Sequence, residues 1–76
     1  DTPIHLCAEE GSAILEGLRK AVAGNRGRIR HLSFQKDLAT GEMNVEAMAR
    51  FRERQDLQPL MDALSALKGV KNVKIG

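Results

Sequence analysis

Four side chains in the sequence belong to residue types that bind metal ions: His5, Cys7, His31 and Glu46. Imidazole, thiolate and carboxylate groups brought together would suit zinc or copper. These residues come from three separate segments, however, without the short ligand spacing that marks structural zinc sites. A single cysteine also cannot make the paired-cysteine site of small metal chaperones. We therefore expect no metal cofactor, and interpret the four as polar side chains on a solvated sheet face.

The histidines and the cysteine do not form a recognisable catalytic arrangement. Neither His5 nor His31 has a nucleophile or an orienting carboxylate at an evident spacing. Cys7 falls within a predicted strand, where no helix dipole would activate its thiol. We expect structural histidines, an inert thiol and no enzymatic activity.

The stretch CAEEGSAIL, residues 7–15, marks the change from a strand to a helix. Ser12 is of a type that caps helices, because its hydroxyl can accept a hydrogen bond from an otherwise unpaired amide. The two glutamates before the glycine would repel a phosphate group at this corner. The stretch is therefore either a capped turn or a corner that holds some other small ligand.

Hydrophobic periodicity predicts four strands and two helices around this corner. The strands are predicted at residues 3–9, 28–36, 42–53 and 70–75, and the helices at residues 12–24 and 56–69. GNRG, at residues 24–27, should end the first helix with two residues that tolerate left-handed conformations, and Gly69 should cap the second. The side of the sheet to which Ile29 points is ambiguous.

The order βαββαβ predicts a ferredoxin-like α+β sandwich. Right-handed crossovers give an antiparallel sheet of order 4-1-3-2 with both helices on one face. The opposite face would then carry His5, Cys7, Glu46, Met48, Arg50 and Lys74.

The case for a nucleic-acid partner rests on one basic group: Arg19, Lys20, Arg26, Arg28 and Arg30. An RNA-binding domain of this topology needs aromatic side chains on the free sheet face, where bases can stack. The predicted face has none, and Glu46 would repel phosphate. The net charge of +2 is also mild. We interpret the basic group as a solvated helix end and loop, and expect no nucleic-acid partner.

Length and composition limit the class of protein to which this chain can belong. A length of 76 residues fits one domain, residues 1–76. One cysteine fits a reducing compartment, so we expect a cytoplasmic location. No run of residues is apolar and long enough to insert into a bilayer. Asp1 is not a natural translation start, so we expect a piece excised from a larger protein.

The whole chain resembles an ACT domain, a βαββαβ regulatory module. One stretch that carries the resemblance is IHLCAEEGSAILEGLRKAV, residues 4–22. ACT domains follow their first strand with an acidic residue, two further positions, a glycine and an apolar helix. Gly11 matches that glycine, Ala8 stands where the acid is usual, and Glu9 and Glu10 are displaced from it. The other stretch is DLQPLMDALSALKGVKNVKI, residues 56–75, which is similar to the closing helix and strand of the family.

The resemblance implies a non-catalytic domain that binds a small effector, such as an amino acid, near the first corner and pairs with a second copy. Gly11 and Ser12 would hold the carboxylate of the effector at the helix N-terminus, and Glu10 its amino group. The alternative is that Gly11 only turns the chain and Ser12 only caps the helix. The absence of an acid at Ala8 makes us favour this capped turn.

Two parent proteins fit the resemblance, and the rest of the parent chain is then a partner. One is an MgtC/SapB-type membrane protein, whose cytoplasmic tail is a divergent ACT-like domain. The other is a RelA/SpoT-type guanosine tetraphosphate synthetase, which carries an ACT domain at its C-terminus. A small metal-binding or RNA-binding ferredoxin-like module is the alternative of another class.

Overall fold

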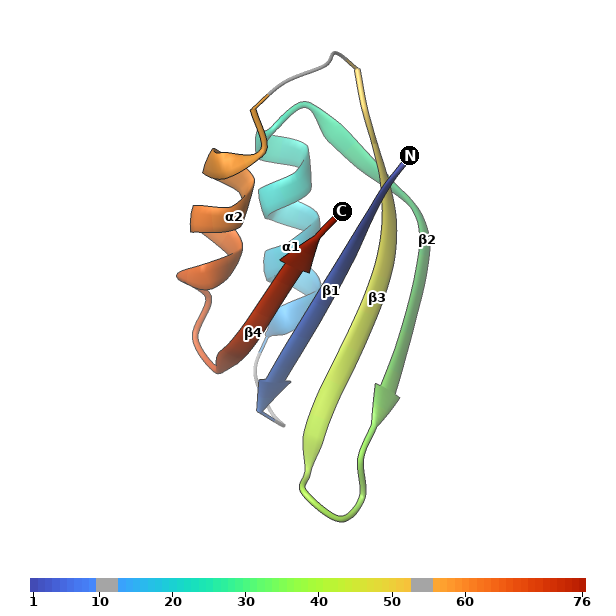
Figure 1. Ribbon diagram of the computed structural model, residues 1–76, viewed down its shortest axis with the longest axis vertical. Helices are drawn as coiled ribbons and strands as arrows, with labels where there is room; N and C mark the ends of the chain where they lie inside the picture. The colour runs from blue at the N-terminus through green and yellow to red at the C-terminus, as the bar shows by residue number, and fades with distance from the viewer. Residues whose placement is uncertain (10–12, 53–55) are drawn as a thin grey trace.

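Strands and helices alternate in the predicted order βαββαβ in the computed structural model, which describes residues 1–9, 13–52 and 56–76 (Figure 1). The elements are β1 (Thr2–Glu9), α1 (Ile14–Gly24), β2 (Gly27–Lys36), β3 (Glu42–Phe51), α2 (Gln58–Ser65) and β4 (Val70–Ile75).

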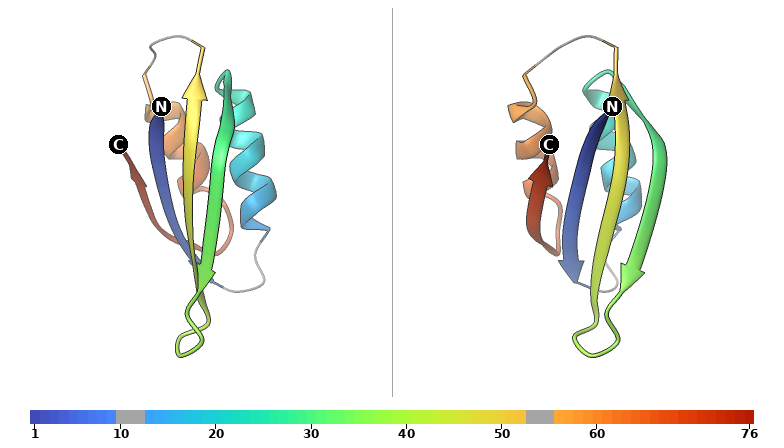
Figure 2. Two further views of the ribbon diagram at one scale, coloured as in Figure 1. Left: turned by 90° about the vertical axis from the view of Figure 1, so that its right-hand side faces the viewer. Right: turned by 45° about the vertical axis from the view of Figure 1, so that its right-hand side comes forward.

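The four strands form one antiparallel sheet of order β2-β3-β1-β4, which is the predicted order 4-1-3-2 counted from the other edge. Both helices cover the same face of this sheet, and the hairpin between β2 and β3 extends beyond them (Figure 2). The predicted ferredoxin-like α+β sandwich is therefore confirmed.

The core lies between the helices and the two central strands. Alternate residues of β1 and β3 are buried under the helices: Ile4, Leu6, Ala8, Val45, Ala47 and Ala49. The helices bury Ile14, Leu18, Val22, Leu60 and Leu64 against them. Three of the six buried positions on the central strands are alanine, which leaves room for the larger helix side chains in a tightly packed interior.

Each edge strand contains one extra residue, which sets the direction of its side chains. In β2 the register with β3 shifts between Ile29 and His31, so Arg30 is the inserted residue. In β4 Val70 pairs with Ala8 and Asn72 with Cys7, so Lys71 is inserted there. A bulge reverses the alternation beyond it, because two residues then oppose one. This is why both Ile29 and Leu32 pack against the core, and it resolves the ambiguity at Ile29.

Two local predictions, the N-cap of the first helix and the C-cap of the second, are wrong. The first helix begins at Ile14 with Ala13 at its N-cap, one residue after the predicted cap Ser12. The first helix ends at Gly24, as predicted from GNRG, and the residue after it with a positive φ is Arg26, at 62°.

The second helix ends at Ser65 with Ala66 as its C-cap, whereas Gly69 was predicted to cap it. The chain uses the three residues after Ala66 to turn into β4. Gly69 has a φ of 89° in that turn, a conformation that glycine adopts without steric cost. Pro59 occupies the first turn of the helix, where its missing N–H is tolerated.

Gly27 allows an aromatic ring to lie against the backbone at the start of β2. A Cβ atom added at this position would lie 2.5 Å from Cδ1 and Cε1 of Phe51 and 3.0 Å from Cγ1 of Val22. We expect Gly27→Ala to lower the free energy of unfolding by about 1–3 kcal/mol, because the ring must leave its site in the core. Urea denaturation measures this change.

Gly24→Ala is the matched control, because a Cβ added at Gly24 meets no atom within 4 Å. Alanine favours the helix over glycine by up to about 1 kcal/mol, so this variant should be as stable as the wild type or slightly more stable. Equal destabilisation by the two substitutions would contradict the close approach of Phe51.

Candidate functional site

The predicted effector corner lies between the end of β1 and the start of α1. Glu10, Gly11 and Ser12, which were predicted to form it, lie outside the described residues. On one side of it, the backbone N–H of Glu9 donates to the carbonyl of Gly69 at 2.9 Å. On the other side, the N–H of Gly17 donates to the carbonyl of Ala13 at 3.1 Å in the first turn of α1. The corner is thus adjacent to the turn that leads into β4.

An ion pair lies beside this corner on the free face of the sheet. Nζ of Lys71 donates to Oε2 of Glu42 at 2.8 Å, and Glu42 is paired in register with Glu9. The hydrogen bond and charge of Glu42 raise the pKa of Lys71, and the charge of Glu9 adds to the effect. The side chains of Glu9, Glu42 and Lys71 together carry a formal charge of −1. The neighbourhood of the corner is therefore better suited to the amino group of a ligand than to a phosphate.

The predicted polar residues of the free face lie in adjacent rows. Nδ1 of His5 is 3.7 Å from Oε1 of Glu46, the residue opposite it on β3, and Lys74 is opposite His5 on β4. Cys7 lies in the next row, between Asn44 and Asn72.

His31 lies on β2 opposite Met48 of β3, so it does not belong to the rows of His5 and Cys7. Within residues 1–9, 13–52 and 56–76, no group of three or more His, Cys, Asp or Glu side chains is arranged to hold a metal ion. The four residues of the metal hypothesis are therefore not brought together as a ligand set.

Both aromatic residues of the chain lie on the helix side of the sheet. Phe34 is opposite Val45, whose side chain is buried under the helices, and Phe51 packs against the core. The free face therefore has no aromatic side chain on which a nucleic-acid base could stack.

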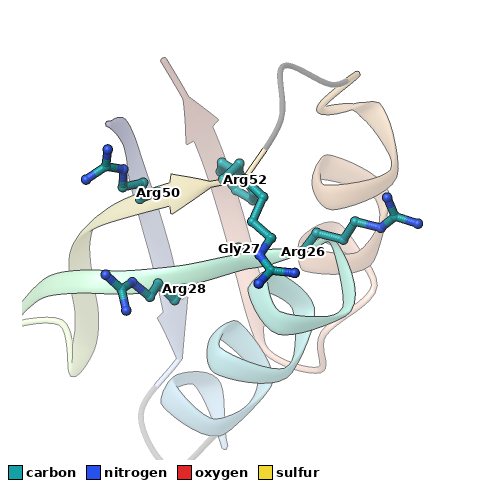
Figure 3. A pocket seen from close by; sticks show the side chains of 6 residues that line it. Arg26, Gly27, Arg28, Arg50 and Arg52 are labelled. Atoms are coloured by element: carbon teal, nitrogen blue, oxygen red, sulfur yellow. The ribbon is translucent and has the colours of Figure 1, made fainter.

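A cluster of arginines that the sequence pattern does not reveal lies at the other end of the sheet. Arg26, Arg28, Arg50 and Arg52 line an open pocket of about 570 Å³ together with Gly27 and Phe51, and their side chains point in different directions (Figure 3). Two of these arginines were predicted to be part of a solvated basic group. The pairing of β2 with β3 adds Arg50 and Arg52 to them, a contact that only the strand register could reveal.

Solved structures with the same arrangement identify the fold. The solution structure of the C-terminal domain of the MgtC protein from Mycobacterium tuberculosis matches 99% of this chain and 83% of that chain, with a TM-score of 0.85 and 13% identity. The crystal structure of the ACT domain from GTP pyrophosphokinase of Chlorobium tepidum matches 99% of this chain and 95% of that chain, with a TM-score of 0.74 and 19% identity. The chain has an ACT-like fold.

The ACT-like fold also matches part of a larger chain. Formyltetrahydrofolate deformylase from Burkholderia mallei contains a similar unit that covers 99% of this chain and 26% of the deformylase, with a TM-score of 0.65 and 7% identity. No protein-family model and no curated protein matches the sequence. In the part of the chain that the structure describes, no helix has the length and apolar character needed to cross a membrane.

Glu42→Gln should lower the pKa of Lys71 toward its ordinary value of 10.5, because the hydrogen bond to Glu42 and its charge are the main causes of the rise. A lysine whose pKa is raised on folding contributes stability below its unfolded pKa, and this contribution is lost as the pH rises through the folded value. NMR titration of the Lys71 side chain measures the pKa.

The control is Glu46→Gln, which removes a carboxylate that pairs with His5 on the same face. This variant should leave the pKa of Lys71 unchanged. A Lys71 pKa that is the same in the Glu42→Gln variant and the wild type would contradict the ion pair.

Proposed function

We propose that this chain is a non-catalytic regulatory and interaction domain of a larger bacterial protein. The observation that carries the proposal is the match of 99% of the chain to the ACT domain of a GTP pyrophosphokinase and to the C-terminal domain of MgtC. Both of these neighbours are domains of larger proteins.

The domain would act by pairing with a second copy along the edge of its sheet. β2 is an edge strand, so one side of its backbone is unpaired within the sheet. Beyond the bulge at Arg30 it runs regularly to Lys36 against β3, and Phe34 on this segment is 59% exposed. An exposed aromatic side chain beside an unpaired strand edge favours a second β2 strand as the partner.

The effector would bind at the corner formed by Glu10, Gly11 and Ser12. The acidic surroundings at Glu9 and Glu42 support an amino group as one recognised part of the ligand. The start of α1 supports a carboxylate as the other, since helix N-termini present unpaired amides. An amino acid carries both groups. Binding at the corner would change the free energy of pairing, which is what regulation by an effector requires.

Two parents fit this role, and we favour an MgtC/SapB-type membrane protein that carries the domain in the cytoplasm. The higher TM-score, 0.85 against 0.74, supports this parent. The higher identity, 19% against 13%, supports a RelA/SpoT-type synthetase as the alternative. The full-length protein fractionates with membranes in the first case and with soluble proteins in the second, which separates the two.

Titration with single amino acids should give saturable amide chemical-shift changes centred on Glu10, Gly11 and Ser12, if the corner binds an effector. Because Glu9 is hydrogen-bonded to Gly69, shifts of these two amides should accompany them. Two-dimensional NMR of the labelled domain measures both effects.

The controls are Mg²⁺ and Zn²⁺, which should not shift the corner, and a variant with Glu10→Gln, which should weaken the response. The absence of saturable shifts at the corner with every amino acid would overturn the effector site. It would leave a turn without a ligand, in an interaction domain whose partner is the rest of its parent chain.

A further inference from the structure

Positive charge is concentrated where β2 begins and β3 ends. Arg28 and Arg50 are directly opposite each other in the register of these strands. The backbone N–H of Arg52 donates to the carbonyl of Arg26 at 3.2 Å, which joins the other two arginines next to this pair. The four side chains spread around the end of the hairpin, with Arg28 and Arg50 on one side, Arg26 on the other and Arg52 between them (Figure 3).

This grouping of four arginines lowers the stability of the folded domain. Like charges directly opposite each other on neighbouring strands repel. No carboxylate of the described residues forms an ion pair with these four side chains, and Asp1, at the same end of the sheet, lies 3.8 Å from Arg30 instead. An anion bound between the arginines would relieve the repulsion.

Arg26 has a conformation that is unfavourable for its residue type. It follows the C-cap residue Asn25 of α1 and has a φ of 62°. Glycine is the usual residue at this position of a helix end, because it adopts positive φ without a steric penalty. The arginine side chain at this position therefore carries a cost in stability, which a role for its charge in binding would offset.

The pocket also borders an apolar side chain, which lies on the helix side of the strands. The ring of Phe51 occupies the space beside Gly27, and both residues line the pocket with the four arginines. Its volume of about 570 Å³ is in the range of small-molecule sites. Guanidinium groups bind phosphate oxygens through two parallel hydrogen bonds, which makes arginine the preferred residue for phosphate groups.

We propose that Arg26, Arg28, Arg50 and Arg52 form a second binding site, which takes a short polyanion with two or more linked phosphate groups. The ligand is either an inorganic oligophosphate or the phosphate chain of a nucleotide. The site is at the end of the sheet opposite the effector corner. The proposal of a polyanion site therefore stands whether or not an effector binds at that corner.

The surroundings favour a short polyanion over a nucleic-acid strand or a membrane. Further along the free face the side chains include Glu46, paired with His5, and Glu42, paired with Lys71, so a long polyanion would meet carboxylates. The exposed large apolar side chains of the described residues are Phe34 and Leu38, near the far end of the hairpin. Among the described residues beside the arginines, the large apolar side chain is Phe51, which is partly buried against the core and so is not free to enter a lipid surface.

Isothermal titration calorimetry with tripolyphosphate, ATP and adenosine tests this proposal. We expect saturable binding of tripolyphosphate and ATP and none of adenosine. The double variant Arg28→Gln/Arg50→Gln should weaken tripolyphosphate binding by about tenfold or more, because it removes two charge-assisted contacts. Tighter binding of ATP than of tripolyphosphate would identify a nucleotide as the ligand, and equal binding an inorganic chain.

Two further variants separate a built site from charge alone and from unfolding. Arg26→Gly should weaken binding several-fold while raising the melting temperature, since glycine fits the positive φ. Arg19→Gln removes one charge from the exposed face of α1, away from the pocket, and should change the affinity by less than about twofold in salt that screens distant charges.

Three results would overturn the proposal. The first is the absence of saturable binding of either phosphate compound. The second is equal weakening by Arg19→Gln and Arg26→Gly, which would show attraction to net charge alone. The third is tighter binding of a single-stranded oligonucleotide or of phosphatidylserine vesicles than of tripolyphosphate, lost in the double variant, which would make the cluster a macromolecular surface.

Discussion

The structure depends on the burial of one face of the sheet under two short helices. The central strands β1 and β3 contribute alternate apolar residues to this interface, and the chain has only two aromatic residues with which to fill it. A domain of 76 residues buries a modest share of its surface, about 60%, so it has few apolar contacts to lose. Alanines at positions 8, 47 and 49 compensate by letting leucines of both helices pack close to the sheet. The other face is thereby left free for polar and charged side chains.

The bulges in the edge strands connect this core to the charges on the free face. Without the extra residue in β2, Ile29 and Leu32 could not both point toward the helices, and the same holds for Val70 and Val73 in β4. Both inserted residues are basic, and each one pairs with an acid across an intervening strand. Arg30 spans β3 to reach Asp1, and Lys71 spans β1 to reach Glu42. The bulges also interrupt the regular edge, which limits unspecific strand pairing.

The sequence was sufficient for the topology because the central strands follow a strict two-residue alternation and all four strands are separated by clear breaks. The end of the second helix was misplaced because Leu67 continues the apolar spacing although the chain has already turned toward β4. The bulges could not be predicted from the sequence, because the alternation of apolar and polar residues does not by itself show an inserted residue. The arginine cluster was missed for a related reason: Arg28 and Arg50 are far apart in the chain and become neighbours only through the register of β2 and β3. The effector corner, in contrast, was predicted from adjacent residues and stays a prediction.

Charge divides the free face into two ends, with arginines where β3 finishes and carboxylates where β1 finishes. We propose effector binding at the acidic end and pairing along the β2 edge, and we propose that the two are linked. Sedimentation equilibrium of the domain over a range of concentrations, with and without a mixture of the common amino acids, tests this most directly. We expect a monomer–dimer equilibrium whose constant changes when the amino acids are present. A domain that stays monomeric at every concentration, or a dimerisation constant that the amino acids leave unchanged, would contradict it.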